Sequence, residues 1–546
     1  MDNNRLAELL FPHIKTLPAD IEARYPARVL PEGAKVTRFA PSPTGFMHIG
    51  NLYGAFADER LAHTSGGVFF LRIEDTDAKR TVENGVELII DTLSKLGMQF
   101  DEGAVSGGDK GDYGPYRQSE RAEIYGTYAK QLVREGKAYP CFCSEQELED
   151  IRARQEEAKL TPGYYGEFAV WRDAPLEKVE AEIANGKAFV LRYRSEGDSS
   201  HKFKFNDMIK GTIDITENDI DHVILKSDGI PTYHFAHAVD DHLMGTTHVV
   251  RDESWLSTLP FHIQLFAALG FKLPKYCHTA QVLKLDNGNK RKISKRKDPE
   301  AALTFYYSEG YPTPALREYL LTLLNSNFEE WRIANPDLPI EKFSFTTKKM
   351  PISGSLFDLD KLNDISKNVI SRLTADEVYE NTLAWAKEFD PEFAAVLSGN
   401  REKAVRILGV GRGGKKPRKD ITLWSGVKHY VSFFYDTLFT REDAIPEGFE
   451  RNVVNEVLAD YAKHYTECAD NSEWFAAVKD VAARHGFCPD MKEYKANPGA
   501  YKGSVADVSM FIRVAVTGRL NSPDLFEVMS ILGRETVINR INDMMR

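Results

Sequence analysis

Two stretches of the sequence decide the fold: RFAPSPTGFMHIGN, from Arg38 to Asn51, and KRKISKRK, from Lys290 to Lys297. The first begins inside a short, mostly apolar run, Val36 to Phe39. The side chains that follow it have a helical period, at positions Leu52, Ala55, Phe56 and Glu59. The pattern predicts a strand, a tight turn and the start of a helix.

The turn of the first stretch has the composition of a phosphate-binding site. Pro41 and Pro43 fix φ, while Gly45 and Gly50 lack a Cβ and let a ligand approach the backbone. The start of a helix offers unpaired amides and a partial positive charge, and His48 can donate a further hydrogen bond to a phosphoryl oxygen. Taken alone, these residues also fit an ordinary Pro/Gly turn with an incidental histidine.

The second stretch is strongly basic. It follows a turn signal, Asp286 to Asn289, so its six Lys and Arg residues are expected on a mobile, solvent-facing loop. Taken alone, such a run also fits a solvated basic patch. Read together with the first stretch, it indicates a nucleotide site.

The two stretches resemble the paired HIGH and KMSKS motifs of class I aminoacyl-tRNA synthetases, here HIGN from His48 and KISKR from Lys292. Other segments are similar to the glutamyl-tRNA synthetase family in particular: Arg38 to Gly45, Arg72 to Asp77, Pro115 to Arg121, Asp228 to Trp255 and Lys502 to Gly518. These similarities run in order from about residue 35 to the C-terminus. The resemblance implies a bacterial-type enzyme that joins L-glutamate to tRNA(Glu).

The implied reaction needs positioning and charge stabilisation, because the substrate carboxylate is itself the nucleophile toward ATP. It gives glutamyl-adenylate and pyrophosphate, and the glutamyl group then passes to the terminal ribose of tRNA. The catalytic candidates are His48, Lys292 and Lys295, of which the resemblance favours Lys295 over Lys292. ATP, with Mg²⁺ as its counter-ion, is expected to contact Ser42, Gly45, His48, Gly50, Asn51, Lys292, Ser294 and Lys295.

Glutamate brings two carboxylates and one ammonium, so a selective site needs guanidinium groups and an acid. Arg38 and Arg251 are candidates for the carboxylates and Glu74 for the ammonium, although each also fits a structural ion pair. A neutral glutamine side chain would leave the charge of Arg251 unpaired. The resemblance implies a glutamate site made of Arg38, Ala40, Ser42, Glu74, Arg80, Tyr233, His237, Arg251 and Trp255.

One position departs from the family pattern. Many members have Asn where this chain has His237, so we expect that contact to be remade or to respond to pH near neutrality.

Contacts with tRNA are expected from basic side chains on an acidic body. The formal net charge is −11, which argues against a nonspecific nucleic-acid coat but permits local basic patches. The candidates are Arg117, Arg296, Lys415, Lys416 and Arg418. The last three lie in a Gly/Pro loop that would equally fit a solvated surface.

Composition restricts the class of protein. The chain has 546 residues, 42% of them hydrophobic and 28% charged, with no apolar run long enough to span a membrane. The N-terminus has no basic start or cleavage site of a secretory signal, so we expect a cytoplasmic protein. The length predicts a multidomain enzyme, which we expect to be a monomer.

Cysteine usage argues against a structural zinc ion. Some members of the resembled family hold zinc with a Cys-x-Cys pair and a second pair some two dozen residues on. Here Cys141 and Cys143 form the first pair, but Phe168 to Arg172 contains neither Cys nor His. We therefore expect no structural zinc and interpret the two thiols as packing residues.

The alternation of strand and helix patterns predicts an α/β multidomain protein: a Rossmann-like, doubly wound parallel sheet with an α+β insertion, followed by a largely all-α C-terminal half. The expected domains are an N-terminal helical extension (1–34), the first half of the catalytic domain (35–140), an insertion binding the acceptor end (141–221), the second catalytic half with the KISKR loop (222–300), a stem-contact domain (301–375) and a helical anticodon-binding domain (376–546).

Several elements can be predicted individually. A strand over Gly67 to Ile73 would place Glu74 at its carboxyl end, where open parallel sheets bind ligands. Helices are expected over Val86 to Leu96, Glu145 to Lys159 and Leu259 to Leu269, and a strand over Thr279 to Leu285 is expected to complete the sheet.

Two alternatives remain at this point. A glutaminyl-tRNA synthetase is disfavoured by Arg251 and by the helical C-terminal pattern, and a noncatalytic tRNA-binding paralogue by the presence of His48, Glu74, Arg251 and Lys295 together. The sequence leaves open whether tRNA(Gln) is also a substrate, whether activation requires tRNA, and what residues 1–34 do.

Overall fold

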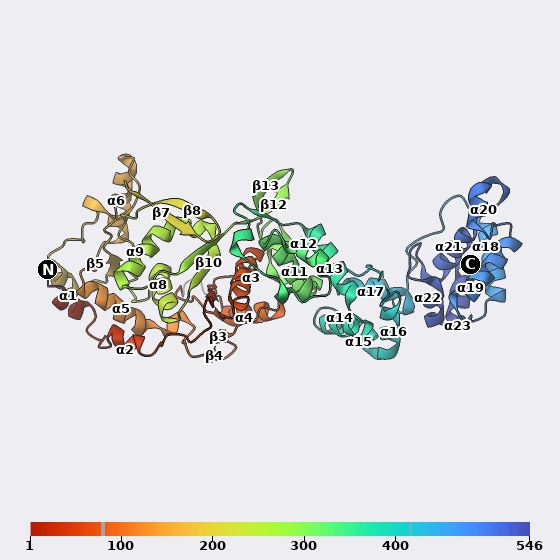
Figure 1. The fold of residues 1–546 in the computed structure, drawn as a ribbon, viewed down its shortest axis with the longest axis horizontal. Coiled ribbons are helices and arrows are strands. Elements are labelled where there is room, and N and C mark those ends of the chain that lie inside the picture. The colour runs from red at the N-terminus through yellow and green to blue at the C-terminus, as the bar shows by residue number, and fades with distance from the viewer. Residues whose placement is uncertain (1, 78–81, 415) are drawn as a thin grey trace. The chain divides into compact units, whose positions relative to one another are not determined.

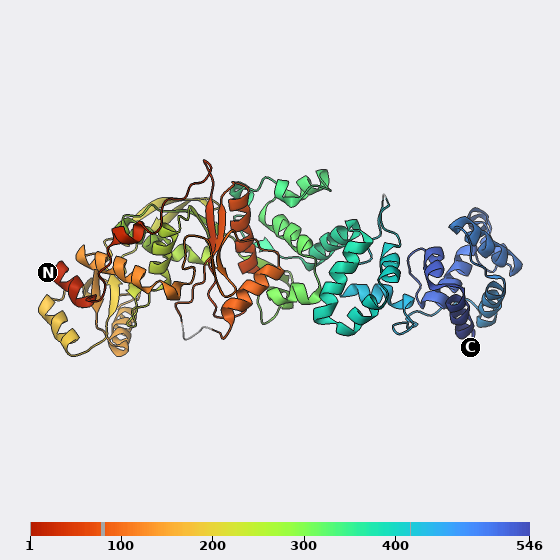
Figure 2. The ribbon, with the colours of Figure 1, turned by 90° about the horizontal axis from the view of Figure 1, so that it is seen from below.

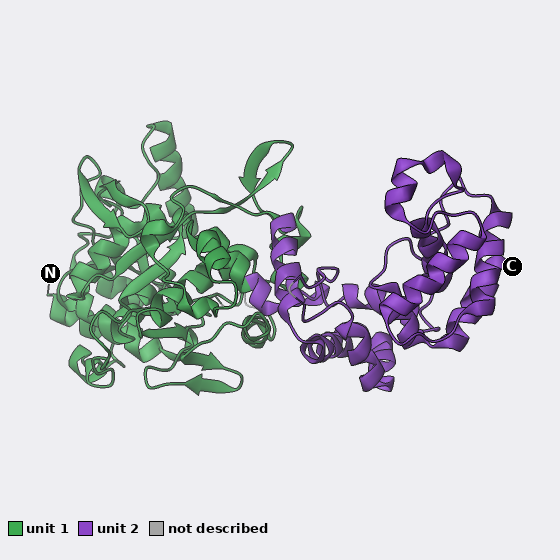
Figure 3. Cartoon of the chain, turned by 45° about the vertical axis from the view of Figure 1, so that its right-hand side comes forward, with its two compact units in different colours: residues 1–305, 317–358 green, residues 306–316, 359–546 purple. Residues whose placement is uncertain are grey.

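The computed structural model describes residues 2–77, 82–414 and 416–546. It divides into two compact units (Figure 3): unit 1 contains residues 1–305 and 317–358, and unit 2 contains residues 306–316 and 359–546. Within the described residues, no helix combines the length and the apolar character that crossing a membrane requires.

The centre of unit 1 is a parallel sheet that begins at β1 (Val36–Phe39). β1 pairs with β2 (Val68–Leu71), and β2 with β3 (Glu102–Val105), in parallel, and β4 (Gly108–Lys110) adds an antiparallel edge. The helices α3 (Ile49–His63) and α4 (Gly85–Lys95) connect these strands. The predicted strand and helix on either side of Glu74 are therefore confirmed, the strand with shorter bounds and the helix shifted by one residue.

The chain later returns to the other side of β1. The amide of Thr247 donates to the carbonyl of Val36 at 2.9 Å, and β10 (His248–Asp252) follows directly. β10 pairs in parallel with β11 (Lys275–Thr279), and α9 (Leu259–Leu269) connects the two (Figure 1). The strand order thus reverses between β1 and β10. This is the doubly wound arrangement that the sequence predicted, and its ligand site is expected at the carboxyl ends of these two strands.

Two local predictions were wrong. The strand expected over Thr279 to Leu285 is divided: β11 ends at Thr279, and β12 (Val282–Asp286) belongs to a separate small sheet with β13 (Asn289–Lys292) and β14 (Ser355–Leu356). The basic stretch is a loop only in its second half, because Asn287 and Gly288, with φ of 49° and 82°, form a tight turn that pairs β13 with β12.

The insertion within the catalytic fold is α+β, as predicted. Its strands β5 (Ala138–Cys141), β6 (Val190–Tyr193) and β9 (Val223–Leu225) form one antiparallel sheet, and β7 (Lys202–Asp207) and β8 (Gly211–Thr216) form a hairpin. The helices of this region are α6 (Glu145–Glu157) and α7 (Leu176–Ala184), and α8 (Tyr233–Leu243) leads back into the catalytic domain.

The N-terminal extension is part of this core. Its helices α1 (Asn3–Leu10) and α2 (Pro18–Glu22) pack against α5 (Ala122–Arg134). Leu6, Leu10 and Ile14 are buried in the same apolar cluster as α5, β5 and β6. The extension predicted as helical over 1–34 is therefore helical only in α1 and α2, and residues 23–34 contain no helix.

Unit 2 contains only helices among its described regular elements beyond residue 359. Two apolar clusters form its interior, one in the region of α14 to α17 and one in the region of α18 to α23 (blue in Figure 2). The helices that follow β13 in the chain are α10 (Leu303–Glu309), α11 (Thr313–Leu324), α12 (Phe328–Ala334), α13 (Leu359–Arg372), α14 (Ala375–Phe389), α15 (Pro391–Gly399), α16 (Arg401–Gly409), α17 (Gly426–Val431), α18 (Arg451–His464), α19 (Asn471–Arg484), α20 (Met491–Ala496), α21 (Val505–Thr517), α22 (Leu525–Leu532) and α23 (Arg534–Met545).

Candidate active site

A cavity of about 460 Å³ lies at the carboxyl ends of β1 and β10, at the reversal point of the sheet. It collects most of the site residues predicted from the sequence: Arg38, Ala40, His48, Gly50, Asn51, Glu74, Tyr233, Arg251, Trp255, Lys292 and Lys295. Its lining also includes residues that were not predicted from the sequence, among them Gly54, Asp58, Val250, Asp252 and Ser254. The two basic and glycine-rich stretches therefore meet on one cavity within unit 1.

His48 is the N-cap of α3 at this cavity. Its Nδ1 accepts a hydrogen bond from the amide of Asn51 at 3.3 Å, while the Asn51 side chain accepts from the His48 amide at 3.0 Å. Burial, with Lys295 and Lys292 nearby, lowers the pKa of His48 to about 4. The imidazole is therefore neutral at pH 7, and because Nδ1 is an acceptor, Nε2 carries the hydrogen.

The basic hairpin supplies the opposite wall. Lys292 and Lys295 both line the cavity and are exposed, and the ammonium of Lys295 donates to the carbonyl of Phe46. Behind them Arg291 donates to both carboxylate oxygens of Asp298, at 2.7 and 2.8 Å, and Asp298 also accepts from the amide of Ser294 at 2.9 Å. A buried acid thus holds the base of a cationic loop.

The acidic and guanidinium groups at the inner end of the cavity form a connected network. Arg38 Nε lies 3.1 Å from both oxygens of Asp241, and Arg72 donates to Asp241 at 2.6 Å and to Glu74 at 3.1 Å. Burial raises the pKa of Glu74 to about 7, although Arg72 and Arg38 act in the other direction. Glu74 therefore changes charge close to neutral pH.

Arg251 lies in a different environment. It is 7% exposed, its guanidinium carbon is 4.6 Å from the centre of the Tyr276 ring, and its hydrogen-bond acceptors are His278, His262 and the carbonyl of Trp255. Tyr233 and Trp255, which also line the cavity, pack with ring centres 4.5 Å apart. The cavity therefore offers a cation together with aromatic side chains.

His237 is not among the residues that line this cavity. It is fully buried behind Tyr233, with ring planes 4° apart, and its Nε2 is 2.9 Å from the Tyr276 hydroxyl. Its Nδ1 lies 2.7 Å from Asp241 Oδ2, and burial lowers its pKa to about 4. A titration of this side chain near neutrality, as considered from the sequence, does not agree with this environment.

Several other predicted contacts lie outside the cavity wall. Ser42, Gly45 and Ser294 are absent from its lining. Arg117 donates to the carbonyl of Gly108 and to Asp109, at 3.0 and 3.2 Å, and so holds the β3–β4 hairpin. Arg296 is exposed. Arg80 lies outside the described residues.

The basic side chains predicted to bind tRNA in the Gly/Pro loop of unit 2 are only partly free to contact a ligand. Lys416 is exposed, whereas Arg418 donates to Asp420 at 2.5 and 3.1 Å. Arg412, which precedes them in the same loop, donates to the backbone carbonyls of Ile370 and Leu408. Lys415 lies outside the described residues.

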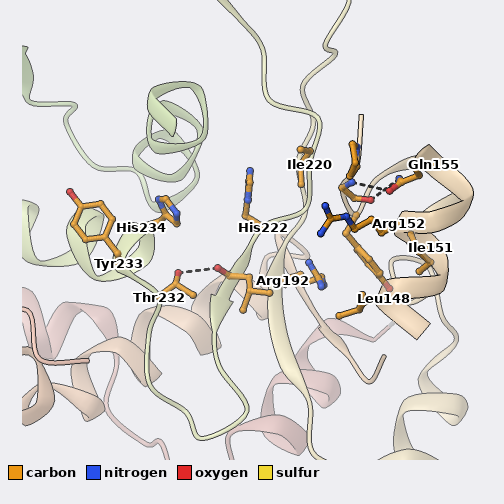
Figure 4. Close-up of a pocket in the computed structure, with 14 residues that line it drawn as sticks. Leu148, Ile151, Arg152, Gln155, Arg192, Ile220, His222, Thr232, Tyr233 and His234 are labelled. Atoms are coloured by element: carbon orange, nitrogen blue, oxygen red, sulfur yellow. Dashed lines mark hydrogen bonds between the residues drawn. The ribbon is translucent and has the colours of Figure 1, made fainter. Parts of the chain in front are cut away.

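A second cavity, of about 610 Å³, adjoins the first and shares Tyr233 with it (Figure 4). It lies between α6 and the segment from β9 to the start of α8. The guanidinium of Arg192 is 4.0 Å from the centre of the Tyr164 ring, and Gln155 exchanges two hydrogen bonds with the backbone of Gly163. This cavity was not anticipated, because its walls come from segments that are distant in the sequence.

The chain is similar to known proteins over nearly its whole length. The family described as "tRNA synthetases class I (E and Q), catalytic domain" matches residues 35–364, and "Anticodon binding domain" matches residues 419–545. Glutamate–tRNA ligase of Acetivibrio thermocellus is 52% identical over all of both chains, and that of Clostridium beijerinckii is 47% identical over 99% of each. A crystal structure of a glutamate tRNA ligase from Elizabethkingia meningosepticum in complex with its amino acid aligns with 94% of this chain and 99% of its own, with a TM-score of 0.74 and 27% identity.

Proposed function

The chain belongs to the glutamate–tRNA ligase family of class I tRNA synthetases, and on that premise we propose that its 460 Å³ cavity activates L-glutamate with ATP for transfer to tRNA(Glu). One observation carries the proposal. His48 and Lys295, from the two diagnostic stretches, face the same cavity as Glu74 and Arg251, which have the charges that glutamate needs. The same cavity therefore has residues suited to ATP at one end and residues suited to glutamate at the other.

At the nucleotide end, the protein stabilises charge that grows during the attack. The glutamate α-carboxylate attacks the α-phosphorus of ATP, the bond to pyrophosphate breaks, and negative charge increases on the leaving oxygens. The Nε2–H of neutral His48, the free amides of α3, Lys292 and Lys295 are the donors available to these oxygens. ATP enters as its Mg²⁺ complex, and the ion belongs to the nucleotide.

At the amino-acid end, the two arginines have different tasks. Arg38 already pairs with Asp241, so it offers only its remaining N–H groups. Arg251 has no carboxylate within 4 Å among the described residues and can bind the side-chain carboxylate of glutamate as its ion partner. Glu74, as a carboxylate, receives the ammonium.

We propose that the second cavity receives the acceptor end of the tRNA. It opens beside Tyr233, and its Arg192–Tyr164 pair and apolar side chains suit an unpaired nucleobase. The helical residues 419–545 match an anticodon-binding domain, so unit 2 would read the far end of the same tRNA. We expect the basic residues Arg296, Lys416 and Arg418 to contribute salt-dependent contacts.

Charging of total tRNA with labelled glutamate or glutamine, in the presence of ATP, tests the proposal. The wild-type protein should charge glutamate, and Arg251→Ala should lose most of that activity. Glutamine charging alone would indicate a glutaminyl enzyme, and charging with neither amino acid would indicate a noncatalytic tRNA-binding protein. Lys15→Ala is the matched control, because it removes an exposed cation that neither lines the cavity nor belongs to the expected tRNA contacts.

A further inference from the structure

The guanidinium of Arg251 is oriented by two imidazoles. Its Nε donates to His278 Nε2 and its Nη1 to His262 Nδ1, each at 3.0 Å. Both histidines are fully buried, one on β11 and the other on α9. Two of the five N–H groups of the arginine are thus held by imidazoles, and a third faces the carbonyl of Trp255 at 3.5 Å, so two remain for a ligand.

These contacts determine the tautomer of each ring, because an arginine side chain can only donate. His278 must accept at Nε2, so its hydrogen is on Nδ1 and points to Asp207 Oδ2 at 2.7 Å. His262 must accept at Nδ1, so its hydrogen is on Nε2 and points to His234 Nδ1 at 2.8 Å. Both imidazoles are therefore neutral in this arrangement.

Burial is the main reason that they stay neutral. It lowers the pKa of His262 well below its usual value, with His237 and Arg251 acting in the same direction. It also lowers the pKa of His278, against the influence of Asp207. Asp207 is occupied on its own side by the amides of Ile209 and Lys210.

Three other buried arginines near this site are paired with acids. Arg38 lies 3.1 Å from Asp241, Arg72 lies 2.6 Å from the same carboxylate, and Arg121 lies 2.8 Å from Asp240. Among the described residues, Arg251 alone of these four has no carboxylate within 4 Å, and Asp207 is separated from it by the ring of His278. Neutral acceptors therefore orient this cation without cancelling its charge.

We propose that His262 and His278 are specificity-determining positioning residues, which hold Arg251 by hydrogen bonds while leaving its charge to be paired by the side-chain carboxylate of the substrate. The inference rests on the proposed function, because it concerns how the same site prefers an anionic over an isosteric neutral side chain. A carboxylate in place of either imidazole would orient Arg251 equally well but would pair its charge in advance. Glutamate would then lose its advantage over glutamine.

The matched variants His262→Asn and His262→Asp separate charge from shape. Both place an acceptor oxygen near the position of Nδ1, and both remove the contact with His234. In pyrophosphate exchange with tRNA present, we expect His262→Asn to keep the KM for glutamate within about threefold of wild type. We expect His262→Asp to raise it on the order of 10²-fold, with the KM for ATP unchanged and the preference for glutamate over glutamine reduced. Equal KM values for glutamate in the two variants would overturn the proposal.

A second pair covers the case in which His262→Asp does not fold. His278→Gln keeps an acceptor near Nε2, whereas His278→Met has similar length and no comparable acceptor. We expect about a tenfold higher KM for glutamate in His278→Met than in His278→Gln, at similar melting temperatures and similar KM for ATP. Loss of ATP and glutamate binding together in both aspartate and methionine variants would count against the proposal, because it would assign the histidines a purely structural role.

Failure of this inference can be distinguished from failure of the proposed function. The wild-type protein is measured in the same assay, so absence of glutamate-dependent exchange there refutes the function itself. Normal wild-type exchange with indistinguishable asparagine and aspartate variants refutes only the positioning role.

Discussion

Arg291 and Asp298 form a bidentate ion pair, at 2.7 and 2.8 Å, across the base of the loop that carries Lys292 and Lys295. The carboxylate of Asp298 is 2% exposed and also accepts from the amide of Ser294. One buried acid therefore fixes both the strand that enters the loop and the residue at its centre. Positioning of this kind decides how well the two lysines meet a triphosphate.

Replacing Asp298 by Asn should loosen the loop without removing any group that contacts ATP. We expect the KM for ATP to rise about tenfold and the KM for glutamate to change little, because the lost contact is charge-assisted but lies outside the amino-acid end. Pyrophosphate exchange at varied ATP measures both. Asp286→Asn is the control, since Asp286 contacts the same Arg291 at 2.6 Å but is more exposed. An equal effect of both variants would argue against a special role for Asp298.

His48 has two functions that one substitution can separate. Asn is a good N-cap, so His48→Asn should preserve the stability of α3 while removing the Nε2–H donor. We expect adenylate formation in a single turnover to fall by about 10² to 10³ with little change in melting temperature. His48→Ala should lose the same activity and, in addition, about 1 kcal/mol of stability from the missing cap. Retained activity in His48→Asn would show that only the cap matters.

Glu74 should make glutamate binding depend on pH near neutrality. Its pKa is about 7 in the folded protein, so the carboxylate that receives the substrate ammonium is present above that pH and is lost as the pH falls through it. We therefore expect the KM for glutamate to rise between about pH 7.5 and 6. Glu74→Gln should have a high KM without this slope. A wild-type KM that is flat over this range would contradict the assignment.

The N-terminal extension should contribute stability and not catalysis. Arg28 donates two hydrogen bonds to Glu102, each at 2.8 Å, and lies 3.7 Å from the centre of the Tyr113 ring. Arg28→Ala leaves Glu102 with a lost partner, so we expect about 2 to 4 kcal/mol of destabilisation. Chemical denaturation measures this, with unchanged KM values for both substrates. Arg24→Ala is the control, because its pair with Glu123 is exposed and 3.6 Å long, and should change stability by less than about 1 kcal/mol.

Local sequence signals were enough to predict the frame of the site. The strand that contains Arg38, the helix start at His48 and the turn before Lys290 depend on neighbouring residues, and each is present in the structure. The strand predicted over Thr279 to Leu285 was wrong because an apolar run does not show where a chain leaves one sheet and enters another.

Contacts between distant segments could not be predicted in this way. The acceptors of Arg251 come from His262 and His278, and nothing in the local patterns around them indicates that the three side chains meet. The second cavity beside Tyr233 could not be predicted for the same reason, because α6 and β9, which form its walls, are distant in the sequence. The family resemblance was enough to predict the main site residues. It did not predict that Arg38 pairs with a carboxylate while Arg251 is held by neutral imidazoles, because this difference depends on contacts between distant segments.

Arg251 should bind the side-chain carboxylate of glutamate in the cavity where His48 faces the phosphate. A crystal structure with a nonhydrolysable sulfamoyl analogue of glutamyl-adenylate would decide this. We predict the side-chain carboxylate at about 2.7 to 2.9 Å from the Arg251 guanidinium, and the sulfamoyl group within hydrogen-bond reach of His48 Nε2. An analogue whose side chain points to Arg38, with Arg251 bound only to His262, His278 and the carbonyl of Trp255, would show that Arg251 does not recognise the substrate.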